Sequence, residues 1–434
     1  MIYSKEYETM QREDLEQLQV ERLQVTLNRV YRNVLFYKNL YDEKKIEISD
    51  IKSLKNLASL PLTSKDDLRG SYPYEAFAVP LRDIVRIHST SGTTGTPIVV
   101  GYTKNDLKIW SCLVARVLSA AGITGNDLVQ IAFNYSQSTG GLGFHYGAEQ
   151  IGASVIPASG EEVLKQIQIM KDYRSSALVS TPGYALHIVS ILEENGMDPQ
   201  ELNLSTGLFG SEPWSEKLRT KIESKLKIKA FDNYGLSEII GPGVAFECDE
   251  HNGLHVNEDH FIVEVIDPET LEVLPAGMEG ELVFTTITKE GFPLIRYRTG
   301  DISSIIEEPC ECGRTTRRIK RVSGRTDDMI IVDGNNIFPS QIEAILFEIE
   351  GVEPHFQIIL NREEGLDVIE LKVEVSSNLF VFDEIRKVQS FQQKIQQQLI
   401  TSLGLHAKIS LIESKSLGRT RGEKIKRVLD LRKL

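Results

Sequence analysis

The sequence predicts an α/β protein in which a large unit is followed by a small α+β unit. From residue 84 onward, short apolar runs alternate with amphipathic helical segments, which is typical of βαβ order around a mostly parallel, covered sheet. From residue 261 the strand-like runs alternate apolar and polar residues between Pro and Gly turns, which favours antiparallel pairing. At 434 residues the chain is too long for one hydrophobic core, so we expect two or three domains.

The N-terminal region is expected to form a helical layer packed on this core. Between residues 5 and 45, leucines, valines and tyrosines recur at helical spacing with charged residues between them. The run Pro61-Leu-Thr-Ser-Lys-Asp-Asp-Leu predicts the start of another helix, with Thr63 or Ser64 as its N-cap and acidic residues in its first turn.

The same patterns predict the elements that follow. In the large unit we expect strands at 84–87, 128–133, 153–157, 177–180 and 204–209, helices at 104–121, 161–173 and 185–196, and antiparallel strands at 261–268, 280–286 and 301–306. In the small unit we expect strands at 329–332, 357–360, 368–375 and 408–412, helices at 339–348 and 382–399, and then a basic tail.

Composition limits the classes of function. The formal charge is 49 − 62 = −13, which disfavours a nucleic-acid-binding protein, because such a protein usually carries a basic face. No apolar run is long enough to cross a bilayer, and the first residues do not resemble a secretory signal. Four cysteines in a chain of this length do not predict a disulfide framework. We therefore expect a cytoplasmic enzyme that binds neither nucleic acid nor membranes.

A loop rich in glycine and hydroxyl residues carries the first chemical signal. In His88-Ser-Thr-Ser-Gly-Thr-Thr-Gly-Thr-Pro97, the glycines expose backbone N–H groups and the hydroxyls add further donors, which suits the binding of nucleotide phosphates. The loop is not a Walker A motif, because Thr96 and Pro97 follow Gly95. Taken alone, the run fits a flexible surface loop equally well. Its candidate phosphate-binding residues are Ser91, Gly92, Thr93, Thr94 and Gly95.

Motifs further along the chain decide between these interpretations. Five segments stand in a fixed order: Ser91-Gly-Thr-Thr-Gly95, Asp232-Asn-Tyr-Gly-Leu-Ser-Glu238, Arg298-Thr-Gly-Asp301, Gly324-Arg-Thr-Asp-Asp328 and Gly422-Glu-Lys424. The set resembles the adenylate-forming superfamily of acyl-CoA synthetases, peptide-synthetase adenylation domains and luciferases. Within it the chain is most similar to the phenylacetate–CoA ligases, on the segments 99–106, 140–149, 232–243 and 324–343.

The resemblance implies a fold and a set of ligands. It implies a large adenylate-forming N-terminal domain, with a helical region at 1–80 and an AMP-binding core at 81–326. A small mobile α+β C-terminal domain at 327–434 would rotate about a hinge near Asp327, although that residue could also be an ordinary linker. The implied ligands are ATP, Mg²⁺, CoA and a carboxylic acid, and the implied assembly is a homodimer.

The resemblance also implies roles for residues of the nucleotide site. Glu238 would be a Mg²⁺ ligand, Asp301 would accept the ribose hydroxyls, and Arg325 would reach the ribose or the α-phosphate. Without the motifs, these three would be a solvated charge, a turn-capping residue and a surface ion pair. The adenosine and phosphate contacts would come from Asp232, Asn233, Tyr234, Gly235 and Ser237, and the adenine-edge loop from Gly210, Ser211, Glu212 and Pro213.

Two further roles fall in the small unit. Lys424 matches the catalytic lysine that neutralises charge between the carboxylate and the α-phosphate. The match is aligned from Arg427-Val-Leu-Asp430, because Glu423 separates Gly422 from Lys424. Lys424, Lys426 and Arg427 could instead form a solvated basic tail. Gly334 matches the glycine that leaves room for the pantetheine arm of CoA.

The sequence departs from the phenylacetate–CoA ligases at two places. Thr96 stands where these ligases commonly have lysine in the phosphate loop. The segment Asn134-Tyr-Ser-Gln-Ser-Thr139 replaces apolar positions of the aryl pocket by polar ones, and Tyr135, Ser136, Ser138, Gly140 and Gly141 are its candidate pocket residues. A more polar pocket predicts a hydroxylated aryl acid, an indole acid or a related substrate.

A second constellation predicts a structural metal site. Cys248, His255, Cys310 and Cys312 supply thiolates and an imidazole, which suit tetrahedral Zn²⁺. His251 is an alternative fourth ligand, and free thiols near a turn are the alternative to a metal. Cys112 lies in an apolar helical segment and is expected to be an ordinary core residue.

Three functions are compatible with these observations. The first is an ATP-dependent aryl-acid CoA ligase that forms an acyl adenylate with release of pyrophosphate and then transfers the acyl group to CoA. The second adenylates an acid but passes the acyl group to a carrier-protein thiol or to an amine. The third is a non-catalytic nucleotide-binding protein, which the presence of Glu238, Asp301 and Lys424 disfavours.

Overall fold

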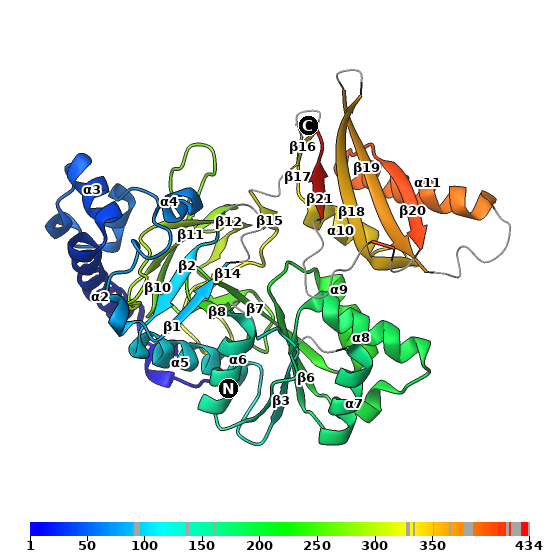
Figure 1. Ribbon diagram of the computed structural model, residues 1–434, viewed down its shortest axis with the longest axis horizontal. Helices are drawn as coiled ribbons and strands as arrows, with labels where there is room; N and C mark the ends of the chain where they lie inside the picture. The colour runs from blue at the N-terminus through cyan, green and yellow to red at the C-terminus, as the bar shows by residue number, and fades with distance from the viewer. Residues whose placement is uncertain are drawn as a thin grey trace. The chain divides into compact units, whose positions relative to one another are not determined.

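The computed structural model describes residues 1–90, 96–135, 139–159, 162–326, 330–332, 335–349, 351–363, 366–376, 385–413, 416–417 and 427–432. Close contacts divide the chain into two compact units (Figure 1). The large unit comprises Met1–Glu212 and Glu223–Arg321, and the small unit comprises Pro213–Ile222 and Val322–Leu434. In the described ranges, no helix has the length and apolar character that crossing a membrane requires.

The N-terminal helices cover one part of the large unit, as the sequence predicts (Figure 1). They are α1 (Lys5–Glu8), α2 (Arg12–Asn33), α3 (Leu35–Glu43) and α4 (Lys65–Gly70), with short 3₁₀ turns η1 (Ile48–Asp50), η2 (Leu54–Ser59) and η3 (Leu81–Asp83). The apolar face of α2 buries Leu23, Leu27 and Val30 against a cluster that includes Ile262 and Ile295. Burial of this face stabilises the helices more than their intrinsic propensity does.

Ser64, rather than Thr63, is the N-cap of α4. The Ser64 hydroxyl accepts a hydrogen bond from Asp67 N at 3.2 Å, and the Asp67 carboxylate accepts one from Ser64 N at 2.7 Å. This reciprocal arrangement satisfies two backbone donors at the helix start. Thr63 is buried instead, and its hydroxyl donates to Ile295 O at 2.7 Å.

A nine-stranded mixed sheet forms the centre of the large unit, in the order β13-β14-β9-β8-β7-β6-β5-β3-β4. Five of its strands are parallel, namely β3 (Leu128–Ile131), β4 (Ser154–Ile156), β5 (Ala177–Ser180), β6 (Thr206–Gly210) and β7 (Lys229–Leu236). The antiparallel ones are β8 (Gly241–Phe246), β9 (Leu254–Val256), β13 (Ile305–Ile306) and β14 (Arg318–Ile319). The predicted βαβ order is therefore confirmed.

The connecting helices are α5 (Lys104–Ala120), α6 (Gly140–Gln150), α7 (Val163–Tyr173) and α8 (Pro182–Glu194), followed by the 3₁₀ turn η4 (Pro199–Leu202) and α9 (Glu216–Leu226). Helix α6 packs closely on α5 because glycine stands at the contact. A Cβ at Gly147 would lie 2.4 Å from Cγ1 of Val114, and one at Gly143 would lie 2.6 Å from the Trp110 ring. The two helices can approach this closely only where α6 has no side chain.

Two antiparallel groups complete the large unit. Strands β1 (Arg86–Ser89) and β2 (Val99–Tyr102) form a hairpin on either side of the glycine-rich loop. Strands β10 (Phe261–Ile266), β11 (Gly280–Thr286) and β12 (Tyr297–Ser303) pair antiparallel, which confirms that prediction. Asp301 lies inside β12 and not at a strand start, because pairing with β11 begins at Tyr297.

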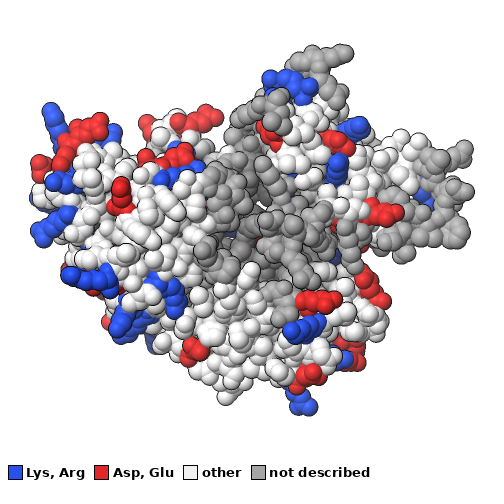
Figure 2. Space-filling model, in the orientation of Figure 1, with Lys and Arg blue, Asp and Glu red and all other residues white. Residues whose placement is uncertain are grey.

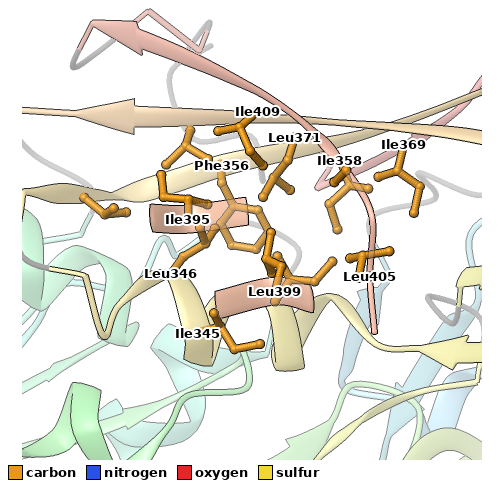
Figure 3. Close-up of a cluster of buried hydrophobic side chains, with 14 of the residues drawn as sticks. Ile345, Leu346, Phe356, Ile358, Ile369, Leu371, Ile395, Leu399, Leu405 and Ile409 are labelled. Atoms are coloured by element: carbon orange, nitrogen blue, oxygen red, sulfur yellow. The ribbon is translucent and has the colours of Figure 1, made fainter. Parts of the chain in front are cut away.

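The small unit contains its own core (Figure 3). Its elements are β15 (Gly324–Arg325), β16 (Ile330–Val332), β17 (Asn335–Ile337), α10 (Pro339–Leu346), β18 (Val352–Glu363), β19 (Leu366–Val375), α11 (Ile385–Leu403), β20 (Lys408–Glu413) and β21 (Val428–Asp430). Figure 3 shows Leu346, Phe356, Leu371, Ile395 and Leu399 gathered between helices and strands, and all five are buried.

The predicted basic tail is partly wrong. Residues 428–430 form β21, which pairs in parallel with β18 through Ile358 and Val428. The flanking positive charges suggest a solvated tail, but Val428 packs on the core of the small unit and the strand pairs with the distant β18. On the face shown in Figure 2, the described basic and acidic side chains are interspersed.

Candidate active site

The carboxyl ends of parallel strands meet at one edge of a sheet, where α/β proteins commonly bind ligands. Tyr135 follows β3, the run Gly210-Ser-Glu212 begins at the end of β6, and Tyr234 lies near the end of β7. The topology therefore places the predicted adenine-edge loop, nucleotide motif and acid pocket at the same edge.

The loop after β6 is fixed by short contacts. A Cβ at Gly210 would lie 2.6 Å from Asn233 O, so β6 and β7 can approach only with glycine there. The Asn233 amide donates to Phe209 O at 2.8 Å, and the Glu212 carboxylate accepts a hydrogen bond from Gly183 N at 2.8 Å. Ser211 has a positive φ of 68° and is exposed, and Pro213 is half-buried.

Asp232 belongs to a buried charge network. Its backbone N–H donates to the Glu247 carboxylate at 2.7 Å. Arg321 donates to the same carboxylate at 3.0 Å, and its Nε lies 3.4 Å from Oδ2 of Asp232. Sequence reasoning missed Arg321 and Glu247, because their roles arise from pairing between segments far apart along the chain.

Asp301 and Tyr234 form a direct pair. The Tyr234 hydroxyl donates to Oδ2 of Asp301 at 2.6 Å, and the Tyr234 ring stacks on Phe284 with 5.9 Å between centroids. Asp301 is 5% exposed, and its backbone N–H donates to the Thr299 hydroxyl at 3.0 Å. The Tyr234 ring and the Asp301 carboxylate are therefore held together.

Glu238 lies in the turn between β7 and β8 and is 5% exposed. Its Oε1 accepts a long hydrogen bond of 3.4 Å from the Tyr297 hydroxyl and lies 3.9 Å from Nζ of Lys65. Its Oε2 makes no hydrogen bond or ion pair with the part of the chain that the structure describes. Magnesium prefers carboxylate oxygens, so a buried carboxylate with one oxygen available fits this ion.

Glycine is required beside this turn. A Cβ at Gly235 would lie 1.9 Å from Gly241 O, and Gly241 itself has a φ of 100°. The predicted nucleotide residue Ser237 joins the turn to α6, because its hydroxyl lies 3.0 Å from that of Thr139.

Lys289 contacts the same turn and was not found from the sequence. Its ammonium donates to Ile239 O at 2.6 Å and to Glu238 O at 3.3 Å. Burial lowers the pKa of Lys289 to about 7, although the nearby carboxylates of Asp106 and Glu238 act in the opposite direction.

The described part of the candidate acid pocket contains polar and aromatic groups. The Tyr135 hydroxyl lies 3.2 Å from Nδ1 of His145, and burial raises the pKa of that hydroxyl. Gly140 and Gly141 form the first turn of α6, where a Cβ at Gly141 would lie 3.2 Å from the Tyr135 ring. Glycine here leaves room for that ring.

Several predicted residues lie outside the described ranges. They are Ser91, Gly92, Thr93, Thr94, Gly95, Ser136, Ser138, Asp327, Gly334 and Lys424. Arg325 is described and ends β15 in the small unit.

Four potential metal ligands converge elsewhere in the large unit. The ligand atoms of Cys248, His255, Cys310 and Cys312 lie within 4.8 Å of one another. The Cys248 and Cys310 sulfurs are 3.7 Å apart, and Nε2 of His255 is 3.4 Å from the Cys312 sulfur. Tetrahedral zinc would place two sulfurs about 3.8 Å apart, and sulfur and nitrogen about 3.6 Å apart. The cluster therefore has dimensions that fit zinc.

Neighbouring groups orient this cluster. Nδ1 of His255 lies 3.1 Å from the Thr316 hydroxyl, which leaves Nε2 facing the cysteines. His251 instead lies 3.5 Å from the Glu247 carboxylate, so His255 is the histidine of the cluster. A hydrogen bond with Cys248 lowers the pKa of the Cys312 thiol. Cys112 is half-buried on α5.

Comparison with known proteins identifies the family. A family model described as AMP-binding enzyme matches residues 9–288, and one described as AMP-binding enzyme C-terminal domain matches residues 334–432. A phenylacetate-coenzyme A ligase of Thermus thermophilus is 44% identical over 100% of both chains. The chain belongs to the phenylacetate–CoA ligases of the AMP-binding enzyme family. The Escherichia coli phenylacetate-coenzyme A ligase is 42% identical over 98% of this chain and 97% of its own.

The fold of this phenylacetate–CoA ligase family member agrees with a solved relative. A crystal structure of 2-hydroxyisobutyryl-CoA ligase in the postadenylation state, in complex with R3-HIB-AMP, matches with a TM-score of 0.91 and 27% identity. The match covers 99% of this chain and 92% of that one. The predictions of family, of fold class and of an AMP-forming acid–thiol ligase are confirmed.

The charge network around Asp232 yields a stability prediction. Arg321→Leu removes the guanidinium from Glu247, which is 2% exposed, and should lower the free energy of unfolding by about 3–5 kcal/mol. Arg317→Leu breaks the more exposed pair with Glu307 and should cost no more than about 1 kcal/mol. Chemical denaturation compares the two variants, and equal losses would contradict the assigned importance of the network.

Proposed function

We propose that this ligase activates an arylacetic acid, or a hydroxylated or indole-bearing relative of one, and transfers it to CoA. The observation that carries the proposal is the buried Glu238 carboxylate, which has one available oxygen in the turn after β7. The similarity to phenylacetate-coenzyme A ligases supports both the aryl acid and the CoA acceptor. The Tyr234–Asp301 pair supports the nucleotide.

The reaction has two balanced steps. A carboxylate is a poor acyl donor because it is a resonance-stabilised anion. In the first step a carboxylate oxygen attacks the α-phosphorus of ATP, the bond to the bridging oxygen breaks, and pyrophosphate leaves. In the second step the CoA thiolate attacks the acyl carbon and AMP leaves. Both steps require alignment of the reactants and compensation of negative charge.

Most of the nucleotide contacts in this proposal come from the large unit, and Pro213 and Arg325 belong to the small unit. Mg²⁺, when bound, neutralises charge on the phosphate oxygens, and Glu238 would hold it. Asp301, oriented by Tyr234, would accept the ribose hydroxyls, and Arg325 would reach the ribose or α-phosphate. The remaining nucleotide contacts would come from Ser91, Gly92, Thr93, Thr94, Gly95, Gly210, Ser211, Glu212, Pro213, Asp232, Asn233, Gly235 and Ser237.

The small unit supplies the moving parts in this proposal. Lys424 would neutralise charge between the carboxylate and the α-phosphate, and rotation about Asp327 would exchange it for Gly334 at the pantetheine channel. The mobile domain would comprise residues 327–434. A few hinge residues suffice for such a rotation, because the change is confined to their backbone angles.

The acid pocket would be more polar than an aryl pocket requires. Ser136 and Ser138 add hydroxyls to a segment that also carries Tyr135, whose hydroxyl faces His145. Gly140 and Gly141 would give the substrate room at the start of α6. A buried polar group in such a pocket discriminates strongly in favour of a substrate that can pair with it.

We also propose that Cys248, His255, Cys310 and Cys312 hold a structural zinc ion. The convergence of four suitable donors within 4.8 Å of one another supports this, because the Cys248–Cys310 and Cys312–His255 separations are close to those of a tetrahedral site. Adenylation chemistry does not need the ion. A cytoplasmic location and a homodimer complete the proposal. The absence of a predicted disulfide framework supports the location, and family likeness alone supports the dimer.

The proposed reaction predicts the behaviour of a lysine variant. Lys424→Ala should abolish pyrophosphate release while largely preserving ATP binding, because the lysine compensates charge only as the adenylate forms. Pyrophosphate release and acyl-CoA formation are measured with phenylacetate, hydroxyphenylacetates, indoleacetate, benzoates and short fatty acids, with Lys426→Ala as the neighbouring control. Unchanged pyrophosphate release in Lys424→Ala would refute the assignment. If the wild type releases pyrophosphate but forms no acyl-CoA, the acyl group passes to another acceptor. If it binds ATP but releases no pyrophosphate with any of these acids, a non-catalytic protein is favoured.

The zinc site predicts a metal content and a stability difference. The purified protein should contain one zinc ion per chain by elemental analysis. Cys310→Ser should lose the zinc and melt at a lower temperature, because the metal stabilises the fold that binds it. Cys112→Ser, which lies outside the cluster, should keep the zinc content and the melting temperature of the wild type. A wild-type protein that contains no zinc and melts at the same temperature as Cys310→Ser would contradict the proposed zinc site.

A further inference from the structure

The turn that carries Glu238 is held by side chains from several distant segments. Lys289 donates to the carbonyl oxygens of Glu238 and Ile239 at 3.3 and 2.6 Å. The Tyr102 hydroxyl donates to Ile240 O at 3.0 Å. The Trp110 indole donates to Pro242 O at 2.9 Å. The carbonyls of residues 238, 239 and 240 in the turn, and of residue 242 in β8, are thus satisfied by side chains from outside the turn.

Lys289 is an unusual member of this group because it is a buried cation. It is 3% exposed, and its ammonium lies 4.6 Å from the ring centroid of Tyr102 and 5.5 Å from that of Phe292. Taking an ammonium out of water is costly unless strong hydrogen bonds and favourable charges offset the cost. The ammonium is surrounded by two backbone carbonyls and two aromatic rings, and the carboxylates of Asp106 and Glu238 lie nearby.

The segment that carries Lys289 is itself fixed. The Asp106 carboxylate accepts hydrogen bonds from Glu290 N at 2.7 Å and Gly291 N at 2.9 Å. The same carboxylate accepts one from Thr103 N at 2.9 Å, at the start of α5. The ammonium therefore approaches the turn from an anchored backbone, and the turn is held in one place relative to α5.

The Glu238 side chain has little to orient it by itself. Its contacts with the described part of the chain are a 3.4 Å hydrogen bond from the Tyr297 hydroxyl and a 3.9 Å separation from Nζ of Lys65, both at Oε1. The position of the carboxylate is consequently set by its backbone, and the strongest side-chain contacts to that backbone at 238 and 239 come from Lys289.

We propose that Lys289 is a positioning residue for the divalent cation: by holding the carbonyls of Glu238 and Ile239, it presents the Glu238 carboxylate to the metal that accompanies the nucleotide. The inference rests on the proposed role of Glu238. Groups that orient a metal ligand commonly control affinity as strongly as a ligand does, because a misplaced ligand binds poorly.

The test measures cation binding directly. Mn²⁺ serves as the probe, and its binding to the enzyme with the α,β-methylene analogue of ATP is followed by electron paramagnetic resonance, so that no turnover occurs. Lys289→Met keeps the aliphatic length but removes the donors, and it should weaken Mn²⁺ affinity by about tenfold. Tyr102→Phe removes the neighbouring hydrogen bond to Ile240 and keeps the ring, and it should change the affinity much less.

A double-mutant cycle separates this role from general destabilisation. Glu238→Gln should weaken Mn²⁺ binding, and adding Lys289→Met to it should weaken binding little further, because the lysine acts through the carboxylate. Fully additive effects, or Lys289→Met with wild-type Mn²⁺ affinity, would overturn the proposal. If Lys289→Met does not fold, Lys289→Gln replaces it, since its shorter amide cannot reach both carbonyls, and the same outcomes apply. Wild-type Mn²⁺ affinity in Glu238→Gln would instead overturn the proposed role of Glu238 itself.

Discussion

The close approach of Gly235 to the carbonyl oxygen of Gly241 is the constraint on which the candidate active site depends. A Cβ at residue 235 would lie 1.9 Å from that oxygen, so only glycine allows β7 and β8 to meet there. The narrow hairpin buries the turn between them, and a buried turn must find partners for its backbone groups. Lys289, Tyr102 and Trp110 supply these partners. Glu238 is thereby fixed in the turn, while its side chain keeps an oxygen for a metal.

Much of this arrangement follows from local sequence. The βαβ order, the antiparallel strands and the core of the small unit are visible as periodicity, and the positions of Glu238 and Tyr234 are visible as motifs. Four cysteine and histidine ligands at separated positions also predict a cluster with His255, although the sequence leaves His251 as an alternative fourth ligand. The structure separates them, because β9 places His255 beside Cys312.

Other features could not be predicted, since they depend on contacts between distant segments. In the sequence, Lys289 looks like an ordinary surface lysine. Its role is visible only in the structure, where its loop packs against α5 and the β7–β8 turn. Arg321 likewise gains its role only where it meets Glu247. Strand β21 consists of Val-Leu-Asp and lies within a basic stretch of the chain that suggests a solvated tail, and its pairing with β18 overrides that suggestion. The sequence predicts a strand that begins at Asp301, yet pairing with β11 extends β12 on both sides of that residue.

The two candidate sites are built by different means. The cysteine–histidine cluster is tied to the N-terminus, because Arg314 donates to the Cys312 sulfur at 3.6 Å and to the Glu8 carboxylate at 2.6 Å. A metal there would stabilise the attachment of α1 as well as the local turn. The nucleotide site is instead built on a glycine hairpin and on the carboxyl edge of parallel strands. In this account the cysteine–histidine cluster stabilises one part of the large unit, and the candidate nucleotide site occupies another part.

The central claim is that this hairpin presents Glu238 for the adenylation of a carboxylic acid. The most direct measurement is phenylacetate-dependent exchange of labelled pyrophosphate into ATP without CoA, for the wild type and for Glu238→Gln. We expect the wild type to catalyse the exchange and the glutamine variant, which keeps the shape but not the charge, to be slower by about a hundredfold. Exchange at the wild-type rate in Glu238→Gln would contradict the account.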